Sequence, residues 1–267
     1  MSKQLLFIAY LFLAVAAVAQ EATFTAAKSV EGEFVDFTVD NLGNYYLLSK
    51  NNQLKKLNAN GDSVGVFNDV RRYGKLHSID ASNPLKVLLY YKNFATVVVL
   101  DRFLNIVNTI DLRKQNIFQA KAIAQSYDNN IWVYDEQSSK LKKIGEDGKV
   151  LSETVDFRMI FDEAPTPVQI FDQDGFVYLY DPEKGVYVFD IYGTFKTKLS
   201  YTGLSNLTVV GKTIIGIENQ SLIAYTTGTF TEKRLTLPVP AAQIEKAVIR
   251  PGHFYVLKND RIQHFTF

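Results

Sequence analysis

The chain has 267 residues, 47% of them hydrophobic, which is enough material to bury a sizeable core. Its 29 basic residues nearly balance its 28 acidic ones, so no global field draws it to nucleic acid or to an anionic membrane. It has no cysteine, which excludes disulfides, a thiolate nucleophile and a lipid-modified cysteine.

The N-terminal residues have the features of a signal peptide. Lys3 gives a positive start, an apolar stretch runs from Leu5 to Val18, and Ala17-Val18-Ala19 supplies the small residues that a signal peptidase requires. The stretch is shorter than the roughly 20 residues of a membrane-spanning helix, so a retained anchor is the less favoured alternative. We expect residues 1–19 to be removed. Residues 20–267 are expected to form one exported domain, periplasmic or extracellular, with no integral membrane segment.

The rest of the chain repeats one unit: an apolar strand, a polar turn, a strand rich in β-branched and aromatic residues, and a third strand that ends in a polar turn. In chain order the units place strands at 36–40, 45–48 and 53–57; at 78–81, 87–90 and 96–100; at 122–124, 131–134 and 140–144; at 168–170, 176–180 and 185–189; at 207–210, 213–217 and 221–225; and at 246–249, 254–257 and 261–265. The short strands alternate apolar with polar residues and are bounded by Gly, Asn, Asp and Pro, as antiparallel hairpins require.

The spacing of the units identifies the architecture. Equivalent third-strand positions recur on average about every 42 residues, which is the length of one four-stranded propeller blade. These positions are Leu57, Leu100, Ile144, Phe189, Tyr225 and Phe265. No stretch after the signal peptide has a sustained helical period. The sequence therefore predicts an all-β fold, a six-bladed β-propeller of four-stranded antiparallel blades.

The end of the chain predicts how the ring closes. Phe267 follows directly on the third strand of the sixth unit, so that blade lacks an outermost strand, and an unpaired edge is costly. Residues 23–29 form a strand candidate that precedes the first unit and belongs to no other blade. We expect this N-terminal strand to complete the last blade, the alternative being a disordered tail.

The units resemble the six-bladed propellers of the NHL and TolB-like superfamily. The resemblance lies in the turn, aromatic strand and glycine-containing ending of Asn44-Tyr45-Tyr46 through Gly61 and of Asn130-Ile131-Trp132 through Gly148, and it covers nearly all of the mature chain. It is specific for architecture and weak for function, because the superfamily includes binding platforms, peptidase-associated domains and lactonases. The leader and the residue usage also resemble those of exported Bacteroidota proteins.

The sequence offers few candidate residues for catalysis. Catalytic propellers of this type, which resemble gluconolactonases, hold a divalent metal in the central channel with oxygens from several inner strands. The corresponding positions here are Asp36, Asp80, Gln169, Asn206 and Glu245. They are scattered in height, whereas a metal needs convergent oxygens, and Asp36 with Glu245 is the best pair. We predict no catalytic residue, no metal and no cofactor, with solvated carboxylates at the channel mouth as the ordinary interpretation.

Other candidate residues also favour structural roles. His77, His253 and His264 fall on an inner strand, a turn of the opposite face and a third strand, which is poor material for a relay or a zinc site. Asp172 to Gly175 resembles a fragment of a calcium loop without its downstream glutamate, and it is interpreted as a turn. Trp132 and the repeated tyrosines are expected to pack between blades.

Three consecutive connections between blades share a pattern that blade packing does not require. They read Asp69-Val70-Arg71-Arg72-Tyr73, Asp111-Leu112-Arg113-Lys114 leading to Phe118, and Asp156-Phe157-Arg158 leading to Phe161. Each has Asp-x-Arg followed by an aromatic residue, and arginine and aromatic side chains are enriched at binding hot spots. The alternatives are local Asp–Arg pairing at each strand end and recognition of a small anionic ligand or glycan.

The sequence thus favours a non-enzymatic scaffold or binding protein that presents one loop face to a protein partner and not to nucleic acid. The predicted partner-binding residues are Arg71, Arg72, Tyr73, Arg113, Lys114, Phe118, Arg158 and Phe161. A metal-dependent hydrolase of the lactonase kind and a glycan-binding propeller are the alternatives.

Overall fold

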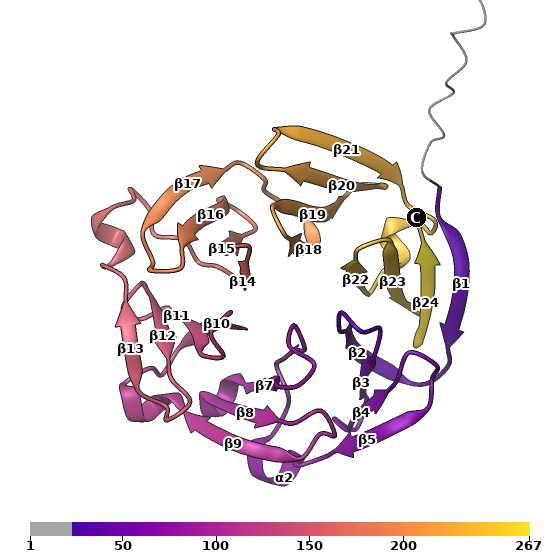
Figure 1. The fold of residues 1–267 in the computed structure, drawn as a ribbon, viewed down its shortest axis with the longest axis horizontal. Helices are drawn as coiled ribbons and strands as arrows, with labels where there is room; N and C mark the ends of the chain where they lie inside the picture. Colours follow the sequence, from indigo (N-terminus) through magenta and orange to yellow (C-terminus); the bar gives the residue numbers. More distant parts are fainter. Residues whose placement is uncertain (1–22) are drawn as a thin grey trace, which may run out of the picture.

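The computed structural model describes residues 23–267, so the predicted signal peptide, residues 1–19, lies outside the described residues. These residues form six four-stranded antiparallel sheets arranged as blades around a central axis (Figure 1). The predicted all-β six-bladed propeller is confirmed. Within this part of the chain, no helix is long and apolar enough to cross a membrane.

The strands follow one another outward from the axis in each blade. Blade 1 contains β2 (Phe34–Val39), β3 (Tyr45–Ser49), β4 (Leu54–Leu57) and β5 (Ser63–Phe67). Blade 2 contains β6 (Ser78–Asp80), β7 (Val87–Tyr91), β8 (Thr96–Leu100) and β9 (Ile106–Asp111). Blade 3 contains β10 (Ala120–Gln125), β11 (Ile131–Asp135), β12 (Lys140–Ile144) and β13 (Val150–Glu153). Blade 4 contains β14 (Gln169–Gln173), β15 (Phe176–Asp181), β16 (Gly185–Asp190) and β17 (Phe195–Leu199).

Blade 5 contains β18 (Ser205–Val210), β19 (Thr213–Glu218), β20 (Ser221–Thr226) and β21 (Thr231–Thr236). Blade 6 contains β22 (Lys246–Arg250), β23 (His253–Lys258) and β24 (Arg261–Thr266), together with β1 (Thr25–Val30) from the other end of the chain. The short helices are α2 (Val70–Tyr73), η1 (Lys92–Phe94), η2 (Leu112–Gln115), η3 (Phe157–Met159) and η4 (Ala241–Gln243).

The ring closes as the sequence predicts. β1 pairs antiparallel with β24, from Thr25 opposite Thr266 to Val30 opposite Ile262. Just before β1, the Phe24 ring packs 5.3 Å from the Phe254 ring, measured between centroids. Both ends of the described chain therefore meet in one blade, beside each other in Figure 1.

The hydrophobic core consists of six clusters, each between two neighbouring blades. The second strands are buried on both faces, which explains why they read as nearly continuous apolar runs. Their tyrosines are buried as expected, and the hydroxyls of Tyr90 and Tyr180 reach the next blade. Tyr90 donates to the Ala120 carbonyl at 2.7 Å, and Tyr180 donates to the Leu204 carbonyl at 2.6 Å. Each such bond satisfies a buried hydroxyl and fixes one blade against the next.

The structure corrects the expectation that all three histidines are separated. His253 and His264 lie on adjacent strands of blade 6, and His253 Nδ1 is 2.9 Å from His264 Nε2. The His264 ring stacks on Tyr255 with 4.3 Å between centroids. Antiparallel pairing of β23 with β24 places Tyr255 opposite His264, so His253 becomes a diagonal neighbour. Burial, His253 and Lys28 together lower the pKa of His264.

Mild acid should therefore lower the free energy of unfolding through His264 in blade 6. The unfolded chain binds a proton at His264 near pH 6.5, where the folded chain resists it, so the free energy of unfolding falls as the pH drops below about 6.5. His77, whose pKa is lowered by burial and by Lys92, acts in the same direction. Urea unfolding at neutral and mildly acidic pH should show a smaller pH dependence in His264→Gln than in the wild type. An unchanged dependence in His264→Gln would contradict this role, and His77→Gln serves as the matched comparison.

Candidate functional site

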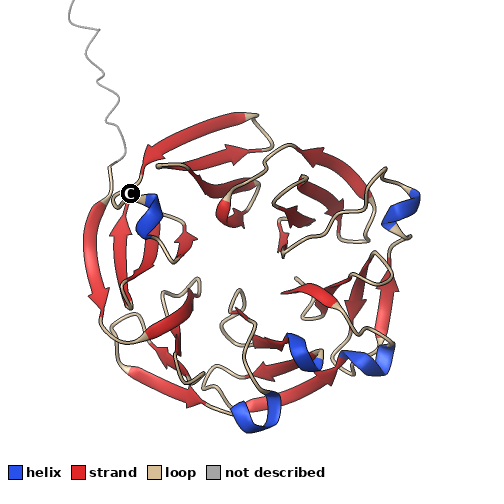
Figure 2. Ribbon diagram, turned by 180° about the vertical axis from the view of Figure 1, so that it is seen from behind, coloured by secondary structure: helices blue, strands red, loops and turns tan. Residues whose placement is uncertain are grey.

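The candidate site lies on the face where the inter-blade connections emerge. Strand direction alternates within a blade, so the connections from outer to next inner strand share a face with the turns between second and third strands. We call this the loop face, and its main connections between blades 1 and 4 are residues 68–77, 112–119 and 154–168. It carries all five short helices of the described chain, which are the blue segments in Figure 2.

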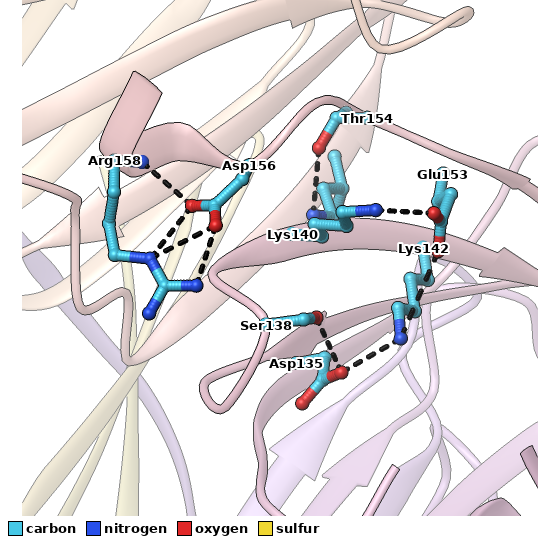
Figure 3. Close-up of polar contacts among 9 residues, drawn as sticks. Asp135, Ser138, Lys140, Lys142, Glu153, Thr154, Asp156 and Arg158 are labelled. Atoms are coloured by element: carbon cyan, nitrogen blue, oxygen red, sulfur yellow. Dashed lines mark hydrogen bonds and ion pairs between the residues drawn. The ribbon is translucent and has the colours of Figure 1, made fainter. Parts of the chain in front are cut away.

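Two of the three Asp-x-Arg motifs form closed local pairs. Asp111 Oδ1 accepts the backbone N–H of Arg113 at 3.0 Å and its Nε at 2.8 Å, while Oδ2 accepts Nη2 at 2.9 Å. Asp156 holds Arg158 in the same way, with Oδ1 bonded to the backbone N–H and to Nε at 2.9 Å (Figure 3). Each aspartate therefore caps a short helix and clasps the arginine two residues later.

The pairing has electrostatic consequences. The Arg113 guanidinium and backbone N–H lower the pKa of Asp111, and Arg158 lowers the pKa of Asp156 in the same manner. The local-pairing alternative thus holds for Arg113 and Arg158. The Arg113 and Arg158 side chains remain exposed, so pairing fixes their orientation without removing them from the surface.

The middle residue of these two motifs has a packing role. Leu112 and Phe157 are both fully buried. The Phe157 ring stacks on Phe189 with 5.0 Å between centroids and an interplanar angle of 16°. Phe161 packs edge-on against Tyr187 at 5.0 Å and is only partly exposed. Phe161 therefore belongs mainly to the packing between blades 3 and 4, although it was predicted at the partner-binding surface.

The first connection is built differently. Asp69 precedes α2 and makes no capping hydrogen bond. Tyr73 is buried, with its ring 5.1 Å from that of Tyr91, and the Arg72 guanidinium lies 5.0 Å from the Tyr73 ring centroid. Tyr73 thus anchors the loop, while Arg71 and Arg72 are exposed. The same sequence pattern therefore forms two different local structures: an Asp–Arg pair in the second and third connections, and a loop anchored by Tyr73 in the first.

The structure adds two residues that the sequence pattern did not single out. Met159 and Ile160 follow Arg158, and Met159 is 81% exposed. On the preceding connection Phe118 is 55% exposed. Large apolar side chains beside a charged residue at the tip of a connection are the signal that could have found them, because exposed apolar side chains that gather on a surface mark interaction sites.

The central channel contains a cavity of about 260 Å³ lined by the inner strands of all six blades. Asp36 and Glu245, the best candidate pair for a channel metal, have other partners: Asp36 makes an ion pair with Lys246, and Glu245 accepts the Asn259 backbone N–H at 2.8 Å. Asp80 accepts the Gln125 backbone N–H at 2.7 Å. Within residues 23–267, no three His, Asp or Glu side chains gather as a metal site would require.

The predicted turn is present at Asp174-Gly175, but Asp172, which comes before it, links two blades. Asp172 lies in β14, and its Oδ2 accepts Trp132 Nε1 at 2.8 Å and Ser126 Oγ at 2.9 Å. Its Oδ1 and the side-chain amide of Gln125 are buried without a hydrogen-bond partner among the described residues. Asn206 Oδ1 accepts the Ala247 backbone N–H at 2.7 Å. Several polar groups of the channel wall therefore tie neighbouring blades together.

Comparison with known proteins establishes the class and no more. The sequence matches no protein-family model and no curated protein. Virginiamycin B lyase from Staphylococcus aureus is similar in structure, with a TM-score of 0.62, 13% identity, and coverage of 91% of this chain and 99% of that one. BamB from Moraxella catarrhalis has a TM-score of 0.52 at 12% identity, covering 92% and 98%. A chain of the mitotic checkpoint complex has a TM-score of 0.58 at 8% identity, covering 95% of each.

The chain is therefore a six-bladed β-propeller whose structural neighbours include both an enzyme and proteins of other kinds. Identities this low show the fold alone, because one propeller scaffold carries many unrelated functions. Any functional conclusion must come from the loop face and the channel of this chain.

Proposed function

We propose that the protein is an exported, non-enzymatic binding protein that holds a protein partner on its loop face. Cleavage after Ala19 and a periplasmic or cell-surface location are part of this proposal, as is its place among NHL and TolB-like propellers of exported Bacteroidota proteins. The observation that carries the binding role is the row of rigid connections that present Phe118, Met159 and Ile160 to solvent.

Rigidity supports a binding role. Phe157 and Tyr73 anchor their loops in the core, and the Asp–Arg clasps fix Arg113 and Arg158. Loops that are already ordered in the free protein lose less conformational entropy on association. They therefore bind more tightly than mobile loops of the same composition. Apolar side chains beside oriented arginines are the arrangement that hot spots of protein interfaces use.

Affinity purification from the native envelope tests the proposal. The double variant Phe118→Ser, Met159→Ser should lose the partner recovered with the wild type, while its melting temperature stays the same because both side chains are exposed. The matched control is Tyr192→Ser, Phe230→Ser, which replaces two exposed rings in turns of the opposite face.

Two outcomes would reject the proposal. One is retention of the partner by the loop-face variant together with its loss in the control. The other is a stoichiometric divalent ion in the purified protein, accompanied by hydrolysis of a lactone, which would establish the hydrolase alternative instead.

A further inference from the structure

One sector of the loop face, at blades 1 and 2, concentrates positive charge. Five cationic side chains and one aromatic ring project from it, and we call them the basic sector. They are Arg71, Arg72, Lys75, Lys92, Lys114 and Phe94. All are exposed. The chain as a whole carries a formal charge of only +1, so this concentration is local.

The segments of the basic sector are in direct contact. η1 lies between the loop at 70–77 and η2. On one side Phe94 packs over Gly74, where a Cβ would lie 3.1 Å from the Phe94 Cε2 atom. On the other side the Leu112 backbone N–H donates to the Ala95 carbonyl at 2.9 Å. The cations therefore share one continuous surface.

The loop beneath the basic sector is fixed at several points. Asn52 donates through Nδ2 to the Gly74 carbonyl at 3.0 Å and accepts the Leu76 backbone N–H at 3.0 Å. The buried Tyr73 ring secures the other end. The sector is consequently preformed, and a ligand would not need to order it.

These cations differ from the other arginines of the loop face in having no acidic partner. Among the described residues no carboxylate lies within ion-pair distance of any of the five, whereas Arg113 and Arg158 are each clasped by an aspartate. Lys92 also acts on His77: after burial, it is the largest cause that lowers the pKa of His77. Lys114 lies close enough to Asp111 to help lower the pKa of that carboxyl, but the carboxylate itself is bonded to Arg113. Like charges without a direct ion-pair partner repel one another, and an anionic ligand would relieve that repulsion.

We propose that the basic sector recognises an acidic protein segment that also carries an apolar or aromatic side chain. This rests on the proposed function and names the chemistry of the partner. The acidic residues would meet Arg71, Arg72, Lys75, Lys92 and Lys114, and the apolar side chain would pack on Phe94. A guanidinium can bind a carboxylate through two N–H groups, so the two arginines give orientation as well as charge.

The rest of the loop face argues against a membrane surface as the occupant. Asp162 and Glu163 are exposed on the connection to blade 4. An anionic bilayer against this connection would repel the exposed Asp162 carboxylate, while Glu163 is paired with Lys184 at 3.3 Å. A peptide segment can follow the basic sector alone.

The test uses synthetic peptides and fluorescence anisotropy with the full mature chain. A short Asp/Glu peptide containing phenylalanine should bind, with affinity that decreases as salt increases. The variant Arg71→Glu, Arg72→Glu, Lys75→Glu should bind it at least about tenfold more weakly, because the reversed charges repel the acidic residues of the peptide. The matched control reverses three exposed cations elsewhere: Lys55→Glu, Arg102→Glu, Lys233→Glu. Melting curves verify that both triple variants fold.

A second variant and other probes complete the design. Phe94→Ser should weaken binding of the phenylalanine peptide but leave its salt dependence unchanged. Equal weakening in the control triple, equal binding of a peptide with serine in place of phenylalanine, or tighter binding to phosphatidylglycerol vesicles or duplex DNA would overturn the proposal.

Failure of this inference can be told from failure of the proposed function. If Arg71→Glu, Arg72→Glu, Lys75→Glu keeps the native partner while Phe118→Ser, Met159→Ser loses it, the loop face binds a partner by other chemistry. If both variants keep the partner, both proposals are wrong.

Discussion

Removal of the N-terminal strand should strongly destabilise the ring. A chain that begins at Glu31 lacks β1, so β24 loses its ladder partner along the whole stretch from Thr266 to Ile262. At about 1 kcal/mol per net hydrogen bond, the lost ladder alone costs several kcal/mol. The side chains of β1 are largely exposed, which means that backbone pairing, with the Phe24 cluster, is the main contribution.

The deletion should also change the association state. An unpaired β24 is an open edge, and open edges pair with other chains. We expect a large drop in melting temperature together with concentration-dependent association in sedimentation experiments. The control is the chain that begins at Gln20, the predicted mature terminus. It keeps β1, so it should show neither the drop in melting temperature nor the added association.

Rescue by a peptide makes the test specific. A peptide of residues 23–32, added in excess to the shortened chain, should restore melting by occupying the edge of β24. The same peptide with prolines in place of Ala26 and Lys28 lacks two of the backbone N–H donors and should not restore the melting temperature. A shortened chain that melts like the control would show that the ring does not depend on this closure.

The success of the fold prediction has a physical reason. Strand alternation and turn residues are local properties, and they recur in every blade. The sixth unit lacked an outer strand, and residues 23–29 formed a strand candidate that belonged to no other blade. Pairing the two was therefore the favoured way to close the ring. Tyr90 and Tyr180 were predicted as core for the same local reason, because they occur in nearly continuous apolar runs.

The site was harder to predict because it depends on where individual loop residues turn. Val70, Leu112 and Phe157 occupy the same position of the repeated motif, yet Val70 is exposed and the other two are fully buried. Spacing identified the connections but could not say which side chain enters the core. The bond between Asp172 and Trp132 joins two blades across 40 positions of sequence, and no local pattern signals such a pair.

The Phe157 ring offers a direct test of the division between core and surface in these loops. Phe157→Ala should lower the free energy of unfolding by about 3–5 kcal/mol, since it empties a buried site between Tyr134 and Phe189. Arg158→Ala should have a far smaller effect, because its pairing with Asp156 is exposed to solvent, where water and salt screen the charges. Phe118→Ala provides the control for loss of an exposed ring.

Urea unfolding of the three variants, combined with recovery of the native partner, separates the two roles of the motif. A destabilised Phe157→Ala that still recovers the partner when folded, beside a stable Arg158→Ala that loses it, would assign Phe157 to the core and Arg158 to the interface. If Arg158→Ala were as destabilised as Phe157→Ala, the clasp would be a structural element, and Arg158 would no longer support partner binding. The same comparison at Arg113, whose clasp on Asp111 has matching geometry, shows whether the answer holds for both connections.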